Sequence, residues 1–488
     1  MKRLTSLDDM ASGIRQPKYQ PSCYGSGIVH LGVGAFHRAH QAVYTDDALA
    51  AGGGEWRIIG VSLRSPAVAD ALNPQNGLYT LIERCDGGSS ARVIGSLSGV
   101  IAATREPGKM IDAMTDPRTR IVSLTVTEKA YGIDRVVGGV DMTHPTITAD
   151  LLEPKTPSGV IGLLVTTLRR RRDRGIPAFT IVCCDNLPNN GALLRAGVLD
   201  FTRRLDPKLA DWIEAYVAFP STMVDRITPA PTDRTRADAA RLIRRDDYGA
   251  VETEAFSQWV VEERFPSGRP SWEAGGALFV DDVTPYERMK LRILNGAHSM
   301  LAYAGYLNGH TYVRDVMANK TLAALVRRHM LAAADTLTPM SGIDLTDYVK
   351  SLLKRFQNPD IDHETYQIAM DGTEKLPQRI LEPAMHALEH GQNIRPFAFA
   401  VAAWMRYGLG RKDDGETYAL RDPLETEIAA CRRNTNARDL AAALQMLPGL
   451  FPDRLSENRI WCDAVESILD SMLKDGVTAA LHLELDKG

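Results

Sequence analysis

Short apolar runs alternate with longer amphipathic stretches in the N-terminal part of the chain. Runs of strand length stand at residues 28–31, 57–63, 78–82, 121–126 and 179–184. The segments between them are long enough to hold helices. Strands that alternate with helices are typical of a doubly wound, mostly parallel sheet that binds ligands at its strand ends. We therefore predict an α/β, Rossmann-like domain over residues 1–284. Residues 134–159 are rich in Pro, Thr and Gly and are expected to lie outside its core.

From Pro285 the pattern changes, and strand-like runs become rare. Residues 408–423 are rich in Gly, Lys and Asp, and this composition predicts a solvent-exposed connection. Elsewhere apolar residues recur at the spacing of amphipathic helices. We predict an all-α domain over residues 285–488, with helices at 286–306, 321–334, 346–355, 378–390, 396–406, 425–431, 438–446 and 462–473.

A glycine turn follows the first apolar run. Gly32-Val33-Gly34 separates that strand from a helical pattern that continues through Ala50. A strand, a glycine turn and a helix together aim backbone N–H groups at a pyrophosphate. The third glycine of the usual fingerprint is missing, because His37 stands in its place. This string alone therefore leaves a simple glycine-rich turn as the alternative to a dinucleotide site.

The end of the second predicted strand bears on the choice of cofactor. A site for NAD usually has an acidic residue there that binds the ribose hydroxyls. This chain has Arg64-Ser65 instead, which leaves room for a 2′-phosphate. Polar clusters also follow two later strands, at 125–129 and 185–191. These clusters suit a substrate site, although turn chemistry alone also places Asn, Asp and Gly at such points.

Composition and charge narrow the class of partner. The 488 residues carry a net charge of -4. Proteins that bind the phosphates of nucleic acid usually have a basic surface, so this charge argues against nucleic acid as a main partner. The basic run 169–172 is expected to end a helix. Six cysteines show no CxxC pair, and no window is long and apolar enough for a membrane span. We expect a reduced, cytoplasmic protein with neither nucleic acid nor membrane as its partner.

The stretch from Glu287 to His298 is predicted to be a helix, one side of which carries a carboxylate, an amine, an amide and an imidazole. At about 100° per residue, Glu287, His298 and Asn295 lie about 60°, 80° and 140° from Lys290. A lysine is a useful base when burial or neighbouring charge lowers its pKa. An amide beside it can stabilise negative charge on an oxygen. The alternative for any such helix is a solvated polar face.

Several segments in order resemble the long-chain mannitol dehydrogenase family of polyol dehydrogenases and reductases. The resemblance covers nearly the whole chain. Lys290, Asn295 and His298 have the spacing of the family's K-x4-N-x2-H helix. The other matching segments are residues 28–40, 122–129 and 219–229.

This resemblance implies a role for each matching residue. Lys290 would exchange a proton with the reacting oxygen, and Asn186 and Asn295 would hold that oxygen. His298 would bind a substrate hydroxyl, and Glu287 would pass the proton on to water. The lysine and the two amides supply the acid and the electrostatic stabilisation, so no metal is needed.

The resemblance also implies a nicotinamide cofactor, taken as NAD with NADP left open. Asp225 and Arg226 would organise the site and the cofactor pocket. His37 and His40 could suggest a metal-ligand pair, but the family and the lack of cysteine partners oppose zinc. The residues predicted to bind the cofactor are Leu31, Gly32, Val33, Gly34, Ala35, Phe36, Arg38, Arg64, Thr127, Glu128 and Asp225.

Residues near position 370 bear on which substrate the protein uses. Mannitol 2-dehydrogenases of this family tend to have Arg and His where this chain has Gln367 and Met370, and the surrounding string resembles fructuronate reductases more closely. A hexuronate carboxylate needs a cation or a bidentate donor, and Lys375 and Arg379 are the candidates. The alternative for Arg379 is a charge on a helix surface. We predict reversible reduction of D-fructuronate to D-mannonate by a monomer or weak oligomer. The alternatives are a mannitol or arabinitol dehydrogenase and, more remotely, a non-catalytic nucleotide-binding protein.

Overall fold

The computed structural model describes residues 1–8, 10–85, 88–134, 138–340, 343–433 and 436–487. The chain divides into two compact units, Met1–Thr284 and Pro285–Gly488.

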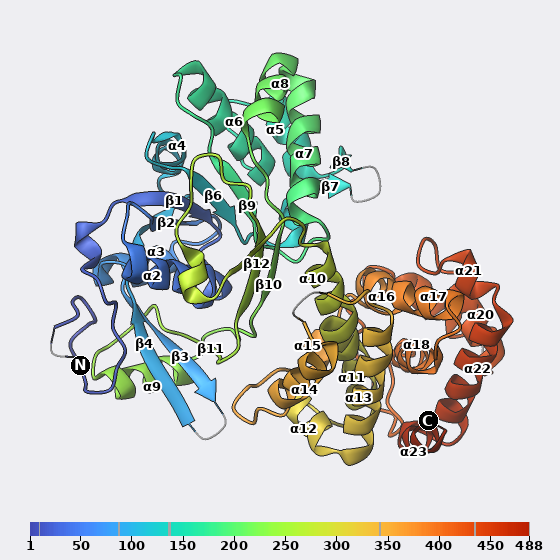
Figure 1. The fold of residues 1–488 in the computed structure, drawn as a ribbon. Coiled ribbons are helices and arrows are strands. Elements are labelled where there is room, and N and C mark those ends of the chain that lie inside the picture. Colours follow the sequence, from blue (N-terminus) through green and yellow to red (C-terminus); the bar gives the residue numbers. More distant parts are fainter. Residues whose placement is uncertain (9, 86–87, 135–137, 341–342, 434–435, 488) are drawn as a thin grey trace. The chain divides into compact units, whose positions relative to one another are not determined.

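A parallel sheet of five strands organises the first unit (Figure 1). Its spatial order is β5-β2-β1-β6-β9, and every neighbouring pair is parallel. From β1 the chain adds β2 and then β5 on one side, and it later adds β6 and then β9 on the other side of β1. This reversal is where open α/β sheets bind ligands, and it confirms the predicted fold. The strands are β1 (Ser26–Leu31), β2 (Arg57–Ser62), β5 (Leu97–Ala102), β6 (Ile121–Leu124) and β9 (Thr180–Cys183).

Alternate residues of these strands enter two different cores. Ile28 belongs to the core that includes Ala42 and Tyr44 of α2. Its neighbour Val29 belongs to the core that includes Leu164 of α6 and other residues of α4 and α7. Because successive side chains of a strand point to opposite faces, the sheet is covered on both sides. The helices named here are α2 (Gln41–Gly52), α4 (Pro107–Thr115), α6 (Val160–Asp173) and α7 (Asn190–Leu205).

One predicted strand belongs to another sheet. The run 78–82 forms β3 (Tyr79–Cys85), which pairs with β4 (Gly88–Ile94) and β11 (Val251–Glu254). The edge of the parallel sheet is β5 instead, which the apolar pattern did not single out. Apolar runs indicate strands but not their pairing. The remaining strands are β10 (Thr222–Asp225), β12 (Gln258–Glu262) and β13 (Leu278–Val280) in one sheet, and β7 (Ile133–Asp134) and β8 (Gly139–Val140) in another.

Two helical expectations in this unit need correction. The helix after the glycine turn is interrupted at His40, whose φ of -126° and ψ of -95° are not helical. Two helices result, α1 (Ala35–Ala39) and α2. In the stretch 134–159, whose residues 135–137 lie outside the described residues, α5 (Pro145–Leu152) places Ile147 in the core at 1% exposure. The other helices are α3 (Ala67–Leu72), α8 (Pro207–Tyr216), α9 (Asp233–Ile243) and the short η1 (Pro21–Cys23), η2 (Asn73–Gln75), η3 (Glu128–Ala130) and η4 (Trp272–Gly275).

The basic run at the end of α6 agrees with the prediction in part. Arg170 and Arg172 lie in the last turn of the helix, where cations complement its dipole. Arg171 is instead buried and donates to the carbonyl oxygens of Pro177, Met114 and Asp116. Burial lowers the pKa of Arg171 to about 10.

Apart from isolated β-bridges, the regular elements in the described residues of the second unit are helices, and the predicted helices are confirmed with shifted ends (Figure 1). Its core includes nearly all of α11 and α18, whose side chains are buried around the helix. Residues 408–423 contain no helix, as expected. The helices are α10 (Thr284–Met289), α11 (Gly296–Leu307), α12 (Val313–Ala318), α13 (Lys320–Asp335), α14 (Leu345–Phe356), α15 (Thr365–Ala369), α16 (Gly372–Leu376), α17 (Glu382–Glu389), α18 (Arg395–Tyr407), α19 (Glu425–Cys431), α20 (Ala437–Gln445), α21 (Asp453–Ser456), α22 (Arg459–Lys474) and α23 (Val477–Asp486).

Two segments of this unit are π-helical, η5 (Lys290–Asn295) and η6 (Pro377–Leu381). Each stands between two α-helices, so that α10, η5 and α11 run on without a break. Such π segments are rare and are often found at functional sites. None of the helices in the described residues has the length and apolar character needed to cross a bilayer.

Candidate active site

The glycine turn of the first unit follows β1 at the reversal of the sheet. Gly32 has a φ of +92°, and a Cβ there would stand 2.1 Å from the carbonyl oxygen of Thr125. The fold itself therefore requires glycine at this position. A Cβ at Gly34 would meet only the carbonyl oxygen of Gly32, at 3.8 Å. Nothing among the described residues excludes a side chain at Gly34, so this side of the turn has room for a ligand to approach the backbone.

Helix α1 begins immediately after the turn, at Ala35. The N–H groups of a helix's first turn have no acceptor within the helix and can bind a pyrophosphate. Leu31 and Val33 are buried on the two sides of Gly32, while Ala35 and Phe36 are half-buried. The turn therefore fits the phosphates of a dinucleotide, although its helical part is a single turn.

Buried side chains behind the turn hold it in place. Nε2 of His30 is 2.9 Å from the hydroxyl of Thr125, which donates to the carbonyl oxygen of Gly32 at 2.8 Å. Nδ1 of His30 is 2.8 Å from the hydroxyl of Ser123. Because the Thr125 hydroxyl donates to Gly32, it accepts from Nε2, and this assigns the proton of His30 to Nε2. Burial lowers the pKa of His30 to about 3, so the ring is neutral.

His37 and His40 both contact other groups of the first unit. The ring of His37 stacks on His30 with centroids 3.4 Å apart. Nε2 of His40 is 2.9 Å from the carbonyl oxygen of Gln258. Both histidines therefore take part in the packing beneath the glycine turn.

The two arginines predicted to bind the cofactor differ in their surroundings. Arg38 is buried, and its guanidinium donates to the carbonyl oxygens of Gly34, at 3.2 Å, and Gly249. Its contacts brace the turn from within the protein. Arg64 is exposed and follows the end of β2, where a ribose would lie. A direct contact with the cofactor remains a prediction for both.

The loop after β6 is held by Asp185, which sequence reasoning placed only within a polar cluster. Its carboxylate accepts from the N–H groups of Val126, at 2.9 Å, and Thr127, at 3.1 Å, and from the hydroxyl of Tyr131 at 2.6 Å. Thr127 has a φ of +77°, which is strained for a residue with a Cβ. Burial raises the pKa of Asp185, and these three bonds oppose that effect. The carboxylate thus keeps Thr127 and the neighbouring Glu128, which is half-buried, in position.

Asn186, the predicted partner of the reacting oxygen, is exposed at the carboxyl end of β9. The nearby Asn190 is buried and links two strands. Its amide nitrogen donates to the carbonyl oxygens of Asp185, at 3.1 Å, and Thr222, at 2.9 Å, while its oxygen accepts from the N–H of Thr222. Asn190 therefore fixes the segment that carries Asn186.

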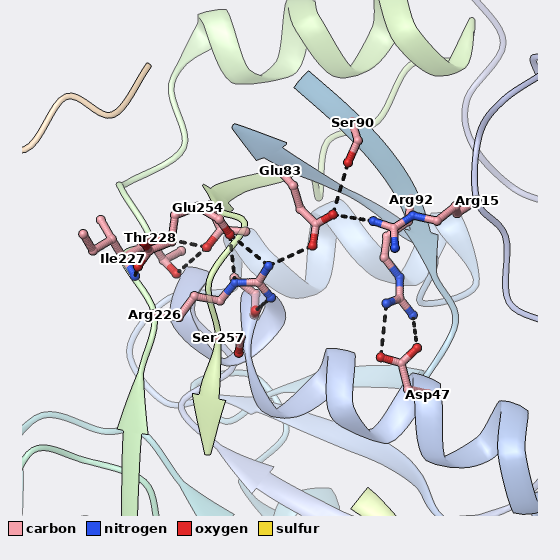
Figure 2. A network of polar contacts seen from close by, with 12 residues as sticks. Arg15, Asp47, Glu83, Ser90, Arg92, Arg226, Ile227, Thr228, Glu254 and Ser257 are labelled. Carbon is pink, nitrogen blue, oxygen red and sulfur yellow. Dashed lines mark hydrogen bonds and ion pairs between the residues drawn. The ribbon is translucent and has the colours of Figure 1, made fainter. Parts of the chain in front are cut away.

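The segment after β10 joins a buried polar network, shown in Figure 2. Asp225 ends β10 and is buried. The guanidinium of Arg226 donates to the carbonyl oxygens of Ala39, at 2.7 Å, and Glu254, and forms an ion pair with Glu83 at 3.0 Å. Because Ala39 ends α1, this network holds the helix that follows the glycine turn. A role of Arg226 in organising the site and the cofactor pocket remains a prediction.

In the second unit the predicted catalytic stretch is not a regular α-helix. The N–H of Gly296 donates to the carbonyl of Leu291, five residues earlier, as in a π-helix. Lys290 and Asn295 are the first and last residues of this π-helix. The angle of about 140° was calculated for a regular α-helix and therefore does not apply to this segment.

The predicted side chains of this stretch differ in exposure. Lys290 and His298 are each 8% exposed, while Asn295 and Glu287 are half-buried. The ring of His298 stacks on Phe356, with centroids 4.4 Å apart. Its Nε2 is buried and has no hydrogen-bond partner among the described residues. Burial, followed by the charges of His363 and nearby cations, lowers the pKa of His298 well below its usual value. Its neutral ring can therefore bind a substrate hydroxyl.

The two candidates for a carboxylate anchor have different contacts. The ammonium of Lys375 donates to the carbonyl oxygens of Ile368, at 3.1 Å, and Met370, so it ties the end of α15 to α16. Arg379 lies in η6, and its Nη1 is 3.3 Å from the hydroxyl of Ser299. Ser299 follows His298 on α11. Arg379 is therefore close to the histidine that is predicted to bind substrate.

Comparison with known proteins bears on the function of these residues. The mannitol dehydrogenase Rossmann domain matches residues 26–274, and the mannitol dehydrogenase C-terminal domain matches residues 282–473. A D-mannonate oxidoreductase of Escherichia coli (strain K12) is 40% identical over 481 residues, which cover 97% of this chain and 98% of that protein. A mannitol 2-dehydrogenase of Phaeosphaeria nodorum is 38% identical over 487 residues, covering 98% of this chain and 84% of its own.

A solved structure shows the same fold. It is the Pseudomonas fluorescens mannitol 2-dehydrogenase in a ternary complex with NAD and D-mannitol. This chain matches it with a TM-score of 0.89 and 37% identity, and the match covers 100% of both chains. The likeness therefore extends over both units.

Proposed function

Because this chain belongs to the mannitol dehydrogenase family, we propose that it reduces D-fructuronate to D-mannonate, reversibly and with NAD as its cofactor. The family assignment makes it an oxidoreductase that acts on a polyol or sugar acid with a nicotinamide cofactor. The proposal concerns the particular substrate, the choice of NAD, and the residues that act.

The single observation that carries the choice of a sugar acid is the position of Arg379. Its guanidinium contacts the hydroxyl of Ser299, next to His298. A guanidinium binds a carboxylate through charge and paired hydrogen bonds. A neutral polyol has no group that needs this charge. The identity of 40% to a D-mannonate oxidoreductase supports the same choice.

The proposed chemistry needs one proton and one hydride for each ketone. The nicotinamide cofactor, when bound, would supply the hydride for the carbonyl carbon. The ammonium of Lys290 gives its proton to the carbonyl oxygen, and Glu287 returns a proton to the lysine from water. The amides of Asn186 and Asn295 stabilise the charge that develops on this oxygen. Oxidation of D-mannonate reverses these steps.

The cradle for the cofactor consists of Gly32, the open side of Gly34 and the first turn of α1. We choose NAD because the solved structure that this chain matches over its whole length contains NAD. The exposed Arg64 at the end of β2 is the feature that would favour NADP. Rates with both cofactors decide between them.

A second candidate function is oxidation of mannitol to its ketose. It is favoured by the mannitol 2-dehydrogenases among the relatives, whose identity to this chain is nearly the same. The test is a set of rates, measured by nicotinamide absorbance, for fructuronate, tagaturonate, fructose and mannitol with both cofactors. The proposal expects the highest kcat/KM for fructuronate. A higher value for mannitol or fructose would replace it with the second function.

A further inference from the structure

His363 contacts the predicted substrate histidine from a different part of the second unit. It lies between α14 and α15, and its ring meets that of His298 edge to face, with centroids 5.1 Å apart. Nδ1 of His363 is buried and has no hydrogen-bond partner among the described residues, and the same holds for Nε2 of His298. Two contacting imidazoles therefore each have a buried nitrogen that the protein itself does not pair.

The segment that carries His363 is firmly held. The N–H of Val313 donates to the carbonyl of His363 at 3.0 Å. Arg314 donates to the carbonyl oxygens of Pro359 and Ile361 and forms an ion pair with Asp362. On the other side, the N–H of Thr365 donates to the carbonyl of Thr311 at 2.9 Å. The backbone around the imidazole is therefore fixed, and a half-buried ring whose buried Nδ1 has no polar partner among the described residues suits a ligand.

The charge around the two rings indicates the kind of ligand. Burial lowers the pKa of His363 to about 4, so that ring is neutral. The pKa of His298 is lowered by burial and further by His363, Arg379, Arg355 and Lys290. Of these neighbours, Arg379, Arg355 and Lys290 contribute positive potential. An anionic group is stabilised by such surroundings, and a neutral imidazole can still donate one N–H to it.

From these contacts we propose that His363, together with Arg379, binds the carboxylate of the substrate beside the hydroxyl-binding His298. Arg379 would supply the charge and His363 a hydrogen bond of fixed direction. His363 is thus a specificity residue for a sugar acid over a neutral sugar. This inference rests on the proposed function, because it needs a substrate with a carboxylate.

The experiment compares the full-length protein with two variants. His363→Phe keeps the aromatic edge against His298 but removes both nitrogens. His363→Asn retains a polar group near the place of Nδ1. His482→Asn, at an exposed site on α23, is the matched control. Thermal melting shows that each variant is folded, and if the Phe variant does not fold, the Asn variant is compared with His363→Ala.

Two readouts separate charge recognition from general damage. The first is the KM and kcat for fructuronate. The second is the calorimetric affinity of the NAD complex for D-mannonate and for its uncharged amide. We expect His363→Phe to raise the KM and weaken mannonate binding about 10- to 100-fold, as for one lost hydrogen bond to a charged group. The affinity for the amide should fall much less, and His363→Asn should recover part of the loss.

Equal losses for mannonate and its amide, or no loss for either, would overturn the role of His363. Failure of the proposed function has a different signature in the unaltered protein. That protein would then show a higher kcat/KM for mannitol or fructose than for fructuronate and would bind mannonate no better than the amide. The two failures are therefore distinguishable.

Discussion

The backbone of Gly296 lies against that of Arg379, and a Cβ at Gly296 would stand 2.8 Å from the carbonyl oxygen of Arg379. The same Cβ would be 3.1 Å from Nε2 of His329. Gly296 follows η5, the π-helix of Lys290, and Arg379 lies in η6. One glycine thus allows the segment with the predicted acid/base to pack on the segment with the predicted carboxylate anchor.

Substitution of Gly296 by alanine should therefore disturb both segments. Because the obstacle is backbone and cannot swing aside, we expect Gly296→Ala to lower the free energy of unfolding by about 1–3 kcal/mol. The kcat/KM should fall as well. Chemical denaturation and steady-state rates measure the two effects. Gly108→Ala is the control, since nothing lies within 4 Å of a Cβ there and alanine favours a helix. A Gly296→Ala protein as stable and active as its parent would contradict the close packing.

Lys290 is predicted to carry the proton in catalysis. Lys290→Met keeps an unbranched side chain of similar reach but removes the amine. We expect kcat to fall about 10²- to 10⁴-fold, as for the loss of a general acid/base. Binding of NADH, followed by its fluorescence, should remain close to that of the parent, because the cofactor cradle belongs to the first unit. Lys354→Met, exposed on α14, is the matched control. Near-normal turnover of Lys290→Met would remove the lysine from the mechanism.

Asp185 is predicted to hold the loop after β6 in a strained form. Asp185→Asn replaces one acceptor oxygen by an N–H₂ donor that faces other donors. We expect the free energy of unfolding to fall by about 1–3 kcal/mol. Without these bonds Thr127 should leave its strained conformation. This change should weaken NADH binding, which is measured as a higher Kd. Asp211→Asn, exposed on α8, serves for comparison. If Asp185→Asn retains both stability and cofactor affinity, the three hydrogen bonds do not have this role.

Buried neutral histidines predict a loss of stability in mild acid. Burial lowers the pKa of His30 to about 3, whereas an unfolded imidazole takes up its proton near pH 6.5. As the pH falls below that value, the unfolded state binds protons that the folded state does not. The stabilisation is therefore complete above pH 6.5 and is lost progressively toward pH 3. Each such histidine should lower the free energy of unfolding by about 2 kcal/mol between pH 7 and pH 5.

Urea denaturation at pH 5, 6 and 7 measures this slope. His30→Gln should reduce the slope by about the share of one histidine, because glutamine does not titrate. His482→Gln, on the exposed surface of α23, should leave it unchanged. A slope in His30→Gln equal to that of the parent would show that His30 does not differ in protonation between the two states.

The sequence by itself determined the α/β and all-α character of the two parts, the glycine turn and the family. Each of these depends on local spacing: apolar runs of strand length, recurrence at helical intervals, and Lys290, Asn295 and His298 at fixed offsets. Leu31 to Gly34 could be placed at a strand end because strand, turn and helix follow one another directly.

Only the tertiary structure decided which strands pair and which side chains meet. Residues 78–82 read as a strand of the main sheet but pair with β4 and β11, because an apolar run does not state its neighbours. The angle between Lys290 and Asn295 depends on a π-helix, which the spacing of side chains does not reveal. The contact of His363 with His298 joins positions 65 residues apart along the chain. Packing between distant segments sets such contacts, and local propensity carries no information about them.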